Sequence, residues 1–239
     1  MSYPGGKAQP GVYQRLINQI PPHHTFISAF LGHCAVTRHK RPATRTIGLD
    51  LATDALDHWR DNPIPGLELL HTNALTYLPT HFQLHDYPPR TNWPPDLLNT
   101  VVYLDPPYPP ETRTNRKIYA NEMSLSNHVT LLQICLRLPC PVIITSYWTP
   151  TYAEFLTKWR SFTYAAMTRG GCTRTETVWT NYPEPAALHD YRHIGTDKRD
   201  RERIRRRAAN WARILATLPH HERAHVLETL THDPEQRPH

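Results

Sequence analysis

Apolar positions along the chain follow two spacings, one typical of strands and one typical of helices. Short apolar runs bounded by turn residues predict strands, and they lie at 25–30, 46–50, 67–72, 100–105 and 141–147. Apolar residues at helical spacing predict helices, which we place at 11–20, 53–61, 124–138 and 149–159. Thr53, and either Ser124 or Ser126, are the expected N-cap residues. The alternation predicts an α/β fold with a doubly wound, mostly parallel sheet.

The last third of the chain breaks this alternation. Two apolar runs, at 161–167 and 176–182, flank the turn-like sequence TRGGCTR and predict an antiparallel hairpin that completes the sheet. From Asp197 onward charged residues dominate, and the pattern predicts two helices separated by Pro219. We therefore expect a domain formed by residues 1–195 and a basic helical extension formed by residues 196–239.

The basic extension has two interpretations. Its apolar residues are spaced to form one side of a helix, which predicts packing on the domain or on the second helix. These residues are Ile204, Trp211, Ile214 and Leu215. Its arginines can also bind phosphates or support self-association. We favour packing, with DNA contact as an addition, and we expect residues 232–239 to fray.

Composition narrows the class of protein. The 239 residues have a mean hydropathy of −0.59, and no apolar run reaches the roughly 18 residues of a spanning helix. The first ten residues do not resemble a signal peptide. We therefore expect a cytoplasmic protein without a membrane partner. The formal net charge of +6 and the pI of about 9.2 favour a polyanionic partner, nucleic acid first and an anionic membrane surface second. A mildly basic enzyme with no such partner is the alternative.

Cysteine and histidine usage predicts neither disulfides nor a metal site. Four cysteines, Cys34, Cys135, Cys140 and Cys172, form no CxxC pair and are expected to be reduced thiols. The sixteen histidines include doublets, but no ligand set at zinc spacing follows them. Cys140 follows a proline, like the nucleophile of cytosine C5 methylases, but no second motif supports that role.

The stretch VVYLDPPYPP, residues 101–110, carries a strand directly into a carboxylate and then fixes the backbone with prolines. Ligands of doubly wound sheets bind at the carboxyl ends of the strands, which is where Asp105 is expected to lie. A lone aspartate at a strand end can simply cap a turn. The tyrosine that follows the two prolines favours a chemical role instead.

Our hypothesis for that role is the methylation of an exocyclic amine on a nucleobase. The lone pair of such an amine is delocalised into the ring, so the nitrogen is a poor nucleophile. A carboxylate that accepts one N–H hydrogen and a rigid carbonyl that accepts the other make the nitrogen nucleophilic by orientation and preorganised dipoles. Asp105 and the Pro106 carbonyl are the expected acceptors, and Tyr108 offers a stacking surface to a flipped base. The expected catalytic set is Asp105, Pro106, Pro107 and Tyr108.

Five motifs in order resemble those of the DNA adenine methylase (Dam) family, especially its phage and prophage members. They are YPGGK at 3–7, FLG at 30–32, IGLD ending at Asp50, TNA at 72–74 and DPPY at 105–108. The sequence TRTETVWTNYPEP and the arginine-rich tail also resemble those members, so the resemblance covers nearly the whole chain. It implies a Rossmann-like fold, S-adenosylmethionine as the cofactor and methyl transfer to N6 of adenine in DNA.

The resemblance also implies which residues bind the cofactor. Asp50 would hold its ribose, Asn73 would meet its adenine, and Phe30 would pack beneath it. The full set is Tyr3, Lys7, Phe30, Gly32, Asp50, Asn73 and Ala74. The chain departs from the family at His33 and Cys34, where small residues are usual. For His33 we consider a clash with the cofactor, a strained loop, a hydrogen bond to the cofactor carboxylate and a reshaped pocket.

Two basic loops are candidates for contact with double-stranded DNA. The first follows DPPY and mixes basic residues with an aromatic one, which suits phosphate contact beside a flipped base. The second is the TRGGCTR turn. A solvated loop and an ordinary hairpin turn are their respective alternatives. The candidate residues are Arg113, Arg116, Lys117, Tyr119, Arg169 and Arg174. We expect a monomer or a weak homodimer, and we leave restriction protection and regulation open as biological roles.

Alternatives to adenine methylation in DNA remain. The same chemistry serves N4 of cytosine or an amine in RNA, because DPPY recognises an amine rather than one base. A second alternative is a degenerate relative that binds DNA without transferring a methyl group. The departure from the family pattern at His33 suggests it. Asn73 and Asp105 are 32 positions apart (105 − 73). In the family that the chain resembles, a target-recognition domain usually interrupts this interval, and here only a proline-rich loop fits. The resemblance therefore implies few base-edge contacts and a short or relaxed target sequence.

Overall fold

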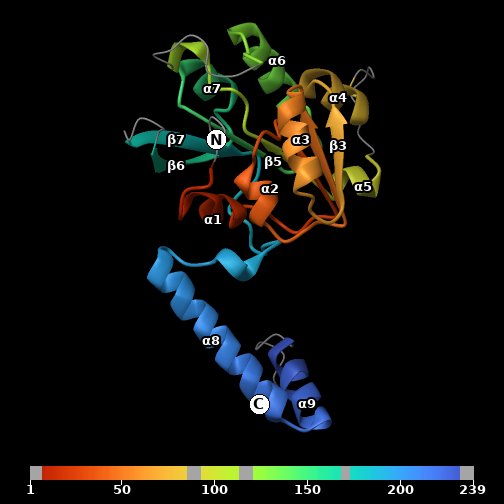
Figure 1. Cartoon of the computed structure of the whole chain (residues 1–239), viewed down its shortest axis with the longest axis vertical. Coiled ribbons are helices and arrows are strands. Elements are labelled where there is room, and N and C mark those ends of the chain that lie inside the picture. The colour runs from red at the N-terminus through yellow and green to blue at the C-terminus, as the bar shows by residue number, and fades with distance from the viewer. Residues whose placement is uncertain (1–6, 85–92, 113–120, 168–172, 232–239) are drawn as a thin grey trace. The chain divides into compact units, whose positions relative to one another are not determined.

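The computed structural model describes residues 7–84, 93–112, 121–167 and 173–231 (Figure 1). These residues form a seven-stranded sheet of order β3-β2-β1-β4-β5-β7-β6. The strands are β1 (Thr25–Ser28), β2 (Arg45–Asp50), β3 (Leu67–His71), β4 (Thr100–Leu104), β5 (Val142–Ser146), β6 (Arg160–Met167) and β7 (Thr173–Thr180). The first five pair in parallel, whereas β7 is antiparallel to β5 and β6. The predicted α/β class, with an antiparallel pair completing the sheet, is confirmed.

Helices cover both faces of this sheet, as a doubly wound fold requires (Figure 1). One face is covered by α1 (Val12–Ile17), α2 (Ala35–His39) and α3 (Thr53–Asp61). The other is covered by α4 (Ala74–His81), α5 (Pro95–Leu98), α6 (Leu125–Cys135) and α7 (Pro150–Phe155). Short 3-10 helices lie at Pro110–Thr112 and Tyr191–His193. Adjacent strand residues serve opposite faces because side chains alternate along a strand.

The central strand β4 shows why the apolar run before Asp105 is continuous. Every residue from Thr100 to Leu104 is buried, since helices cover both sides and strands β1 and β5 flank it. Parallel strands that are buried on both faces read as uninterrupted apolar runs. The strand therefore delivers Asp105 to the carboxyl edge of the sheet.

Several local predictions differ from the structure. Thr53 is the first residue of α3 and its N-cap is Ala52, which has no side chain to bond the helix. The sequence pattern also missed α2, α4 and α5, because α2 and α5 have five and four residues and α4 contains Pro79. By contrast Ser124 does cap α6, where its hydroxyl accepts from the Asn127 amide.

The chain divides into two compact units, Met1–Tyr191 and Arg192–His239. The second unit contains α8 (Lys198–Thr217) and α9 (His220–Thr231), which Pro219 separates as expected. No residue of either helix is buried, and Trp211 is 60% exposed. Ile204 and Leu215 of the expected packing side are partly buried, whereas Trp211 and Ile214 are exposed, and packing of this side on the domain stays a prediction. Residues 232–239, where we expect fraying, lie outside the described residues.

Three further observations bear on function. None of the helices that the structure describes is long and apolar enough to cross a bilayer. The described residues also contain no group of three or more histidine, cysteine, aspartate or glutamate side chains that could hold a metal ion. Cys34, Cys135 and Cys140 are free and buried, while Cys172 lies outside the described ranges.

Candidate active site

The loop after β1 turns at Gly32, where the chain passes the carboxyl end of β2. Gly32 has a φ of +40°, a conformation that side chains disfavour. Its N–H donates to Asp50 Oδ2 over 2.7 Å, and its carbonyl accepts from the Trp59 indole over 2.7 Å. The Ala52 N–H donates to Asp50 Oδ1 over 2.8 Å. Asp50 thus holds the backbone at Gly32, after β1, and at Ala52, after β2, at the carboxyl edge of the sheet.

A second constraint on this loop comes from Gly48 in the middle of β2. The Leu31 side chain lies so close that a Cβ added at position 48 would be 2.6 Å from Leu31 Cδ2. The Leu31 N–H also donates to the Leu49 carbonyl over 2.8 Å. The glycine therefore allows the loop to lie directly against β2.

Asp50 retains acceptor capacity after these two hydrogen bonds. Each carboxylate oxygen can accept more than one hydrogen bond, and the Asp50 side chain is partly exposed. Burial raises the pKa of Asp50 from its usual value, although the backbone N–H groups of Ala52, Gly32 and Leu51 oppose that shift. Hydroxyl groups, as on a ribose, match the acceptor capacity that remains.

At the end of β3, Asn73 is the N-cap of α4. Its side-chain oxygen accepts from the Leu75 N–H over 2.9 Å. The preceding Thr72 N–H donates to the Asp50 carbonyl over 3.2 Å. These contacts hold the β3 end beside the β2 end, so that both strands contribute to one edge of a pocket.

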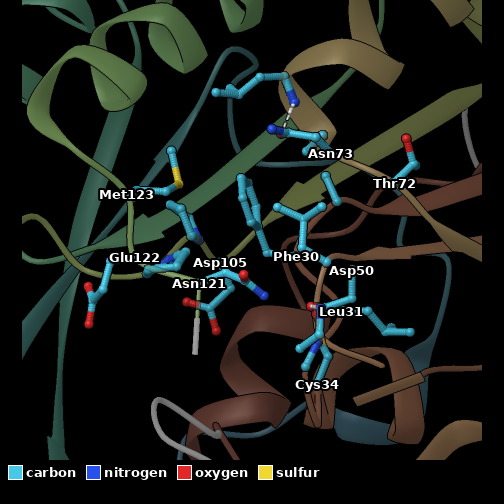
Figure 2. Close-up of a pocket in the computed structure, with 18 of the residues that line it drawn as sticks. Phe30, Leu31, Cys34, Asp50, Thr72, Asn73, Asp105, Asn121, Glu122 and Met123 are labelled. Atoms are coloured by element: carbon cyan, nitrogen blue, oxygen red, sulfur yellow. Dashed lines mark hydrogen bonds between the residues drawn. The ribbon is translucent and has the colours of Figure 1, made fainter. Parts of the chain in front are cut away.

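One cavity joins the two sets of residues that the sequence singled out (Figure 2). From the cofactor set it is lined by Lys7, Phe30, Gly32, Asp50, Asn73 and Ala74. From the catalytic set it is lined by Asp105, Pro106 and Pro107. Residues that sequence reasoning did not place here also line it, including Leu75, Asn121, Glu122, Met123 and Asn127. Motifs far apart in the chain thus meet around a single space.

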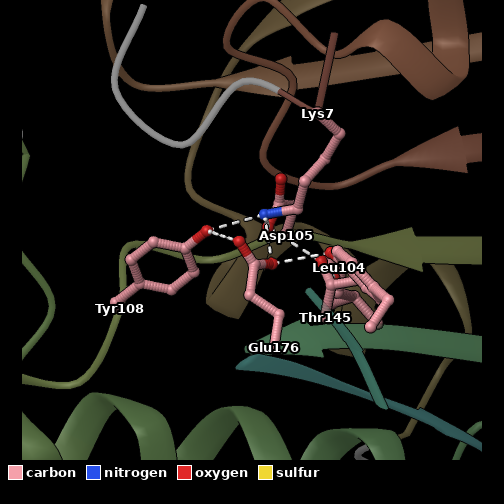
Figure 3. Close-up of polar contacts among 7 residues, drawn as sticks. Lys7, Leu104, Asp105, Tyr108, Thr145 and Glu176 are labelled. Atoms are coloured by element: carbon pink, nitrogen blue, oxygen red, sulfur yellow. Dashed lines mark hydrogen bonds and ion pairs between the residues drawn. The ribbon is translucent and has the colours of Figure 1, made fainter. Parts of the chain in front are cut away.

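Among the residues that the structure describes, Asp105 is held through one oxygen, and its second oxygen receives no hydrogen bond from them. Lys7 Nζ lies 3.0 Å from Asp105 Oδ1, and the Thr145 hydroxyl donates to the same oxygen over 2.8 Å (Figure 3). Neither of these donors occupies Oδ2. The carboxylate is therefore fixed in orientation while one oxygen can accept from a substrate.

Glu176, on β7, contacts three polar side chains in a buried network that includes Lys7 (Figure 3). Lys7 Nζ lies 2.8 Å from Glu176 Oε2 and donates to the Tyr108 hydroxyl over 2.7 Å. The Tyr108 hydroxyl donates to Glu176 Oε1 over 2.8 Å, and the Tyr164 hydroxyl donates to Oε2 over 2.6 Å. A buried carboxylate needs such donors to offset its lost hydration.

The charges of this network set the protonation of its members. Burial alone would lower the pKa of the Lys7 ammonium, but Asp105, Tyr108, Tyr164 and Glu176 outweigh it and raise that pKa well above its usual value. Lys7 therefore stays charged at neutral pH. Burial raises the pKa of Asp105, Lys7 counteracts that shift, and Glu176 reinforces it. The two carboxylates thus share one cation.

Tyr108 has a more enclosed position than a base-stacking surface requires. Its side chain is 8% exposed, and its ring lies 4.2 Å from the Tyr147 ring between centroids. The hydroxyl is held by Lys7 and Glu176. Stacking of Tyr108 on a flipped base stays a prediction, and it requires one face of this ring to be uncovered.

The predicted DNA contacts fall mostly on residues that the structure does not describe. These are Arg113, Arg116, Lys117, Tyr119 and Arg169, together with Tyr3 of the cofactor set. Arg174 is described, and it donates to the Thr112 carbonyl over 2.8 Å. Its guanidinium also lies 5.5 Å from the Tyr147 ring centroid. Arg174 therefore supports the chain that follows DPPY.

His33 lines the cavity, and its ring is stacked on His58 of α3, with 3.9 Å between centroids. Burial, and then the neighbouring His58, lower the pKa of His33 from its usual value. Stacking fixes one face of the imidazole against α3. The altered glycine loop therefore has a defined side chain at the cavity wall.

Cys140 has no features of a nucleophile. The side chain is 3% exposed, and burial raises the pKa of its thiol to about 12. A thiolate is the reactive form. Cys140 also precedes β5, whereas the cavity lies at the carboxyl ends of the strands. Both observations are consistent with a buried cysteine that only packs in the core next to β5.

Comparison with solved structures finds methyltransferases of low similarity to this chain. No family model and no curated protein matches the chain. A SAM-dependent methyltransferase from Agrobacterium tumefaciens has 9% identity and a TM-score of 0.46, and the match covers 70% of this chain but 58% of that one. An rRNA methylase from Streptococcus thermophilus has 14% identity and a TM-score of 0.39, covering 70% and 92%. The 23S rRNA methyltransferase ErmE has 10% identity and a TM-score of 0.42, covering 79% and 72%. Likenesses at this level assign no activity to the chain.

Proposed function

We propose that this chain is an S-adenosylmethionine-dependent methyltransferase that modifies the N6 amine of adenine in DNA. The observation that carries the proposal is the single cavity that joins Asp50 to Asp105, Pro106 and Pro107. A cofactor site and an amine-binding site must share one space for a methyl group to pass between them. The geometry of Asp105 and the basic charge of the chain support the same assignment.

The residues around the cavity fit the proposed cofactor. Asp50 has acceptor capacity for the two ribose hydroxyls, and Gly32 lets the backbone approach closely. Phe30, Asn73 and Ala74 line the same cavity and would hold the remainder of the molecule. When bound, S-adenosylmethionine supplies an electrophilic methyl group.

The chain itself prepares the amine. Asp105 Oδ2 accepts one N–H hydrogen, and the Pro106 carbonyl, on a backbone stiffened by two prolines, accepts the other. Lys7 and Thr145 hold Oδ1 and oppose the rise in the pKa of Asp105 that burial causes. The amine nitrogen loses one proton on methylation, and Asp105 is placed to receive it and pass it to water. This is catalysis by orientation and preorganised electrostatics.

The cofactor role of Asp50 gives one prediction. Asp50→Ala is expected to weaken binding of S-adenosylmethionine on the order of 100-fold, because each hydrogen bond to a charged acceptor contributes about 1.5–3 kcal/mol. Calorimetric titration with the cofactor measures this without any turnover. Asp54→Ala, at an exposed position in the first turn of α3, should bind like the unaltered protein. Equal affinities in both variants would remove Asp50 from the cofactor site.

A second prediction concerns pH. Asp105 acts as its carboxylate, so the rate should fall as the pH drops through its raised pKa. The Thr145 hydroxyl bond lowers that pKa, so Thr145→Val should raise it further and move the acid limb of kcat/KM to higher pH. The plateau at alkaline pH should change little. A pH–rate profile measures the shift, with Thr157→Val at an exposed position as the control. An unmoved limb contradicts the assigned role of Asp105.

The decisive experiment is transfer from labelled S-adenosylmethionine to duplex DNA, single-stranded DNA and RNA, followed by mass spectrometry of the digested nucleosides. N6-methyladenine from DNA supports the proposal. N4-methylcytosine, or a labelled RNA nucleoside, keeps the amine chemistry but replaces the substrate. Binding of cofactor and DNA without any labelled product points to a non-catalytic relative. Sequencing of the methylated positions tests the expected short or relaxed target.

A further inference from the structure

The basic charge of the chain is concentrated in one helix. Helix α8 carries eight basic and two acidic residues, a net charge of +6. The formal net charge of all 239 residues is also +6. The charges outside α8 cancel only as a sum: residues 1–191 have a net charge of +2 (16 basic and 14 acidic), and residues 192–197 and 218–239 together have −2 (3 basic and 5 acidic). Helix α8 therefore carries most of the net positive charge that attracts a polyanion at long range.

These charges are arranged around most of the helix circumference. At 3.6 residues per turn, the basic side chains span roughly two thirds of the circumference. The remaining stripe is apolar and is formed by Ile204, Ala208, Trp211 and Leu215. Seven of the eight basic residues are arginines. The planar guanidinium of arginine can bind a phosphate through two hydrogen bonds.

The basic residues of α8 are accessible. No residue of the helix is buried. Among the residues that the structure describes, the ion pair within α8 joins Arg203 to Asp200 over 2.6 Å. Arg205, Arg206 and Arg207 are exposed, and they form the densest run of charge on the helix. A run of this kind repels itself unless counterions or phosphates neutralise it.

We propose that α8 binds duplex DNA by lying along the major groove, with its arginines on phosphates of both strands. A helix with side chains is about 10–12 Å wide and the major groove of B-DNA is about 12 Å wide. The wide basic surface reaches both walls of such a groove. A-form RNA has a narrow major groove that does not admit the helix. The proposal deepens the proposed function, on which it rests for the choice of DNA.

This assignment separates affinity from chemistry. Phosphate contacts position a protein on DNA without reading its sequence, so α8 would supply binding strength and salt dependence. The cavity and Asp105 would supply the reaction. Loss of charge in α8 should therefore raise the KM for DNA and leave kcat nearly unchanged.

The test uses the full chain with Arg205→Gln, Arg206→Gln and Arg207→Gln combined. Glutamine retains helix propensity, and circular dichroism checks that α8 persists. The matched control removes the same charge from exposed sites of the domain, with Arg15→Gln, Arg41→Gln and Lys158→Gln combined. The affinity for a fluorescent DNA duplex is measured over a series of salt concentrations.

We expect the α8 variant to weaken DNA binding on the order of 100-fold at about 0.1 M salt. The slope of log K against log salt should fall by about 2 to 3, since each lost phosphate contact reduces it by about 0.9. The control should bind within about threefold of the unaltered protein. Equal losses in the two variants, an unchanged slope, or equally tight binding of an RNA duplex would each overturn the assignment. So would an unchanged DNA affinity together with a dimer formed through the apolar stripe.

The binding measurement does not depend on turnover, so it separates the two proposals. Suppose that the unaltered protein transfers no methyl group but the α8 variant loses DNA affinity. This result supports the role of α8 and rejects the catalytic proposal. Normal methyl transfer together with DNA binding that matches the control rejects the role of α8 alone.

Discussion

Asp105→Ala is expected to reduce methyl transfer on the order of a thousandfold or more, while the protein still folds and binds its cofactor. The substitution removes the oxygen that accepts the amine hydrogen, and loss of one preorganised polar group in such a site typically costs 10²- to 10³-fold in rate, with loss of proton acceptance adding to it. Folding should persist because Lys7 retains Glu176 and Tyr108 as partners.

Single-turnover transfer of a labelled methyl group to duplex DNA measures this effect. Asp105→Asn is the matched variant, because it keeps the volume of the side chain but cannot take up a proton from the amine. It should also be strongly impaired. Cofactor titration and thermal unfolding of both variants verify that the site is otherwise intact. A rate within tenfold of the unaltered protein would place the chemistry elsewhere.

Lys7→Met is expected to be the most destabilising single change in the site. It leaves the buried Glu176 and the partly buried Asp105 without the cation that they share. Removing one partner of a buried ion pair costs about 3–5 kcal/mol, which corresponds to a fall in Tm on the order of 10 °C for a domain of this size. One of the carboxylates should then take up a proton, which would also reduce the rate of transfer.

A double variant separates the buried charge from the lost side chain. Combining Lys7→Met with Glu176→Gln removes one carboxylate, so we expect it to regain a large part of the lost stability. Lys158→Met, at an exposed position, should leave the Tm nearly unchanged. Chemical or thermal unfolding of the unaltered protein, Lys7→Met, Glu176→Gln and the double variant provides the coupling free energy. If the double variant were no more stable than Lys7→Met, the buried charge would not explain the loss.

What the sequence could and could not predict follows from the range of each interaction. Asp105 was predictable because its signal is local, an apolar strand that ends in a carboxylate and two prolines. Glu176 was not, since Lys7 and Tyr108 are 101 positions apart and Tyr108 and Glu176 are 68 apart. Its one local signal is a charged residue among the inward positions of an apolar strand. Helix α4 was missed because Pro79 disguises its last turn.

The cofactor side shows the same division. Asp50 ends a strand and belongs to a motif, so its position at the cavity was expected. Met123 and Asn127 line the cavity from a segment beyond β4 that carries no motif. The stacking of His33 on His58 depends on how α3 packs against the loop, which a pattern along the chain does not contain.

Gly48 has an evolutionary consequence that its plain position in a strand conceals. A side chain there would press on the buried Leu31 side chain, which would have to move to make room beside the loop that Gly32 and Asp50 hold in place. Substitution at position 48 is therefore easier where position 31 carries a smaller side chain. In descendants of this chain, substitutions at positions 48 and 31 should occur together. The shape of the pocket would then depend on a pair of residues that take no part in binding or catalysis.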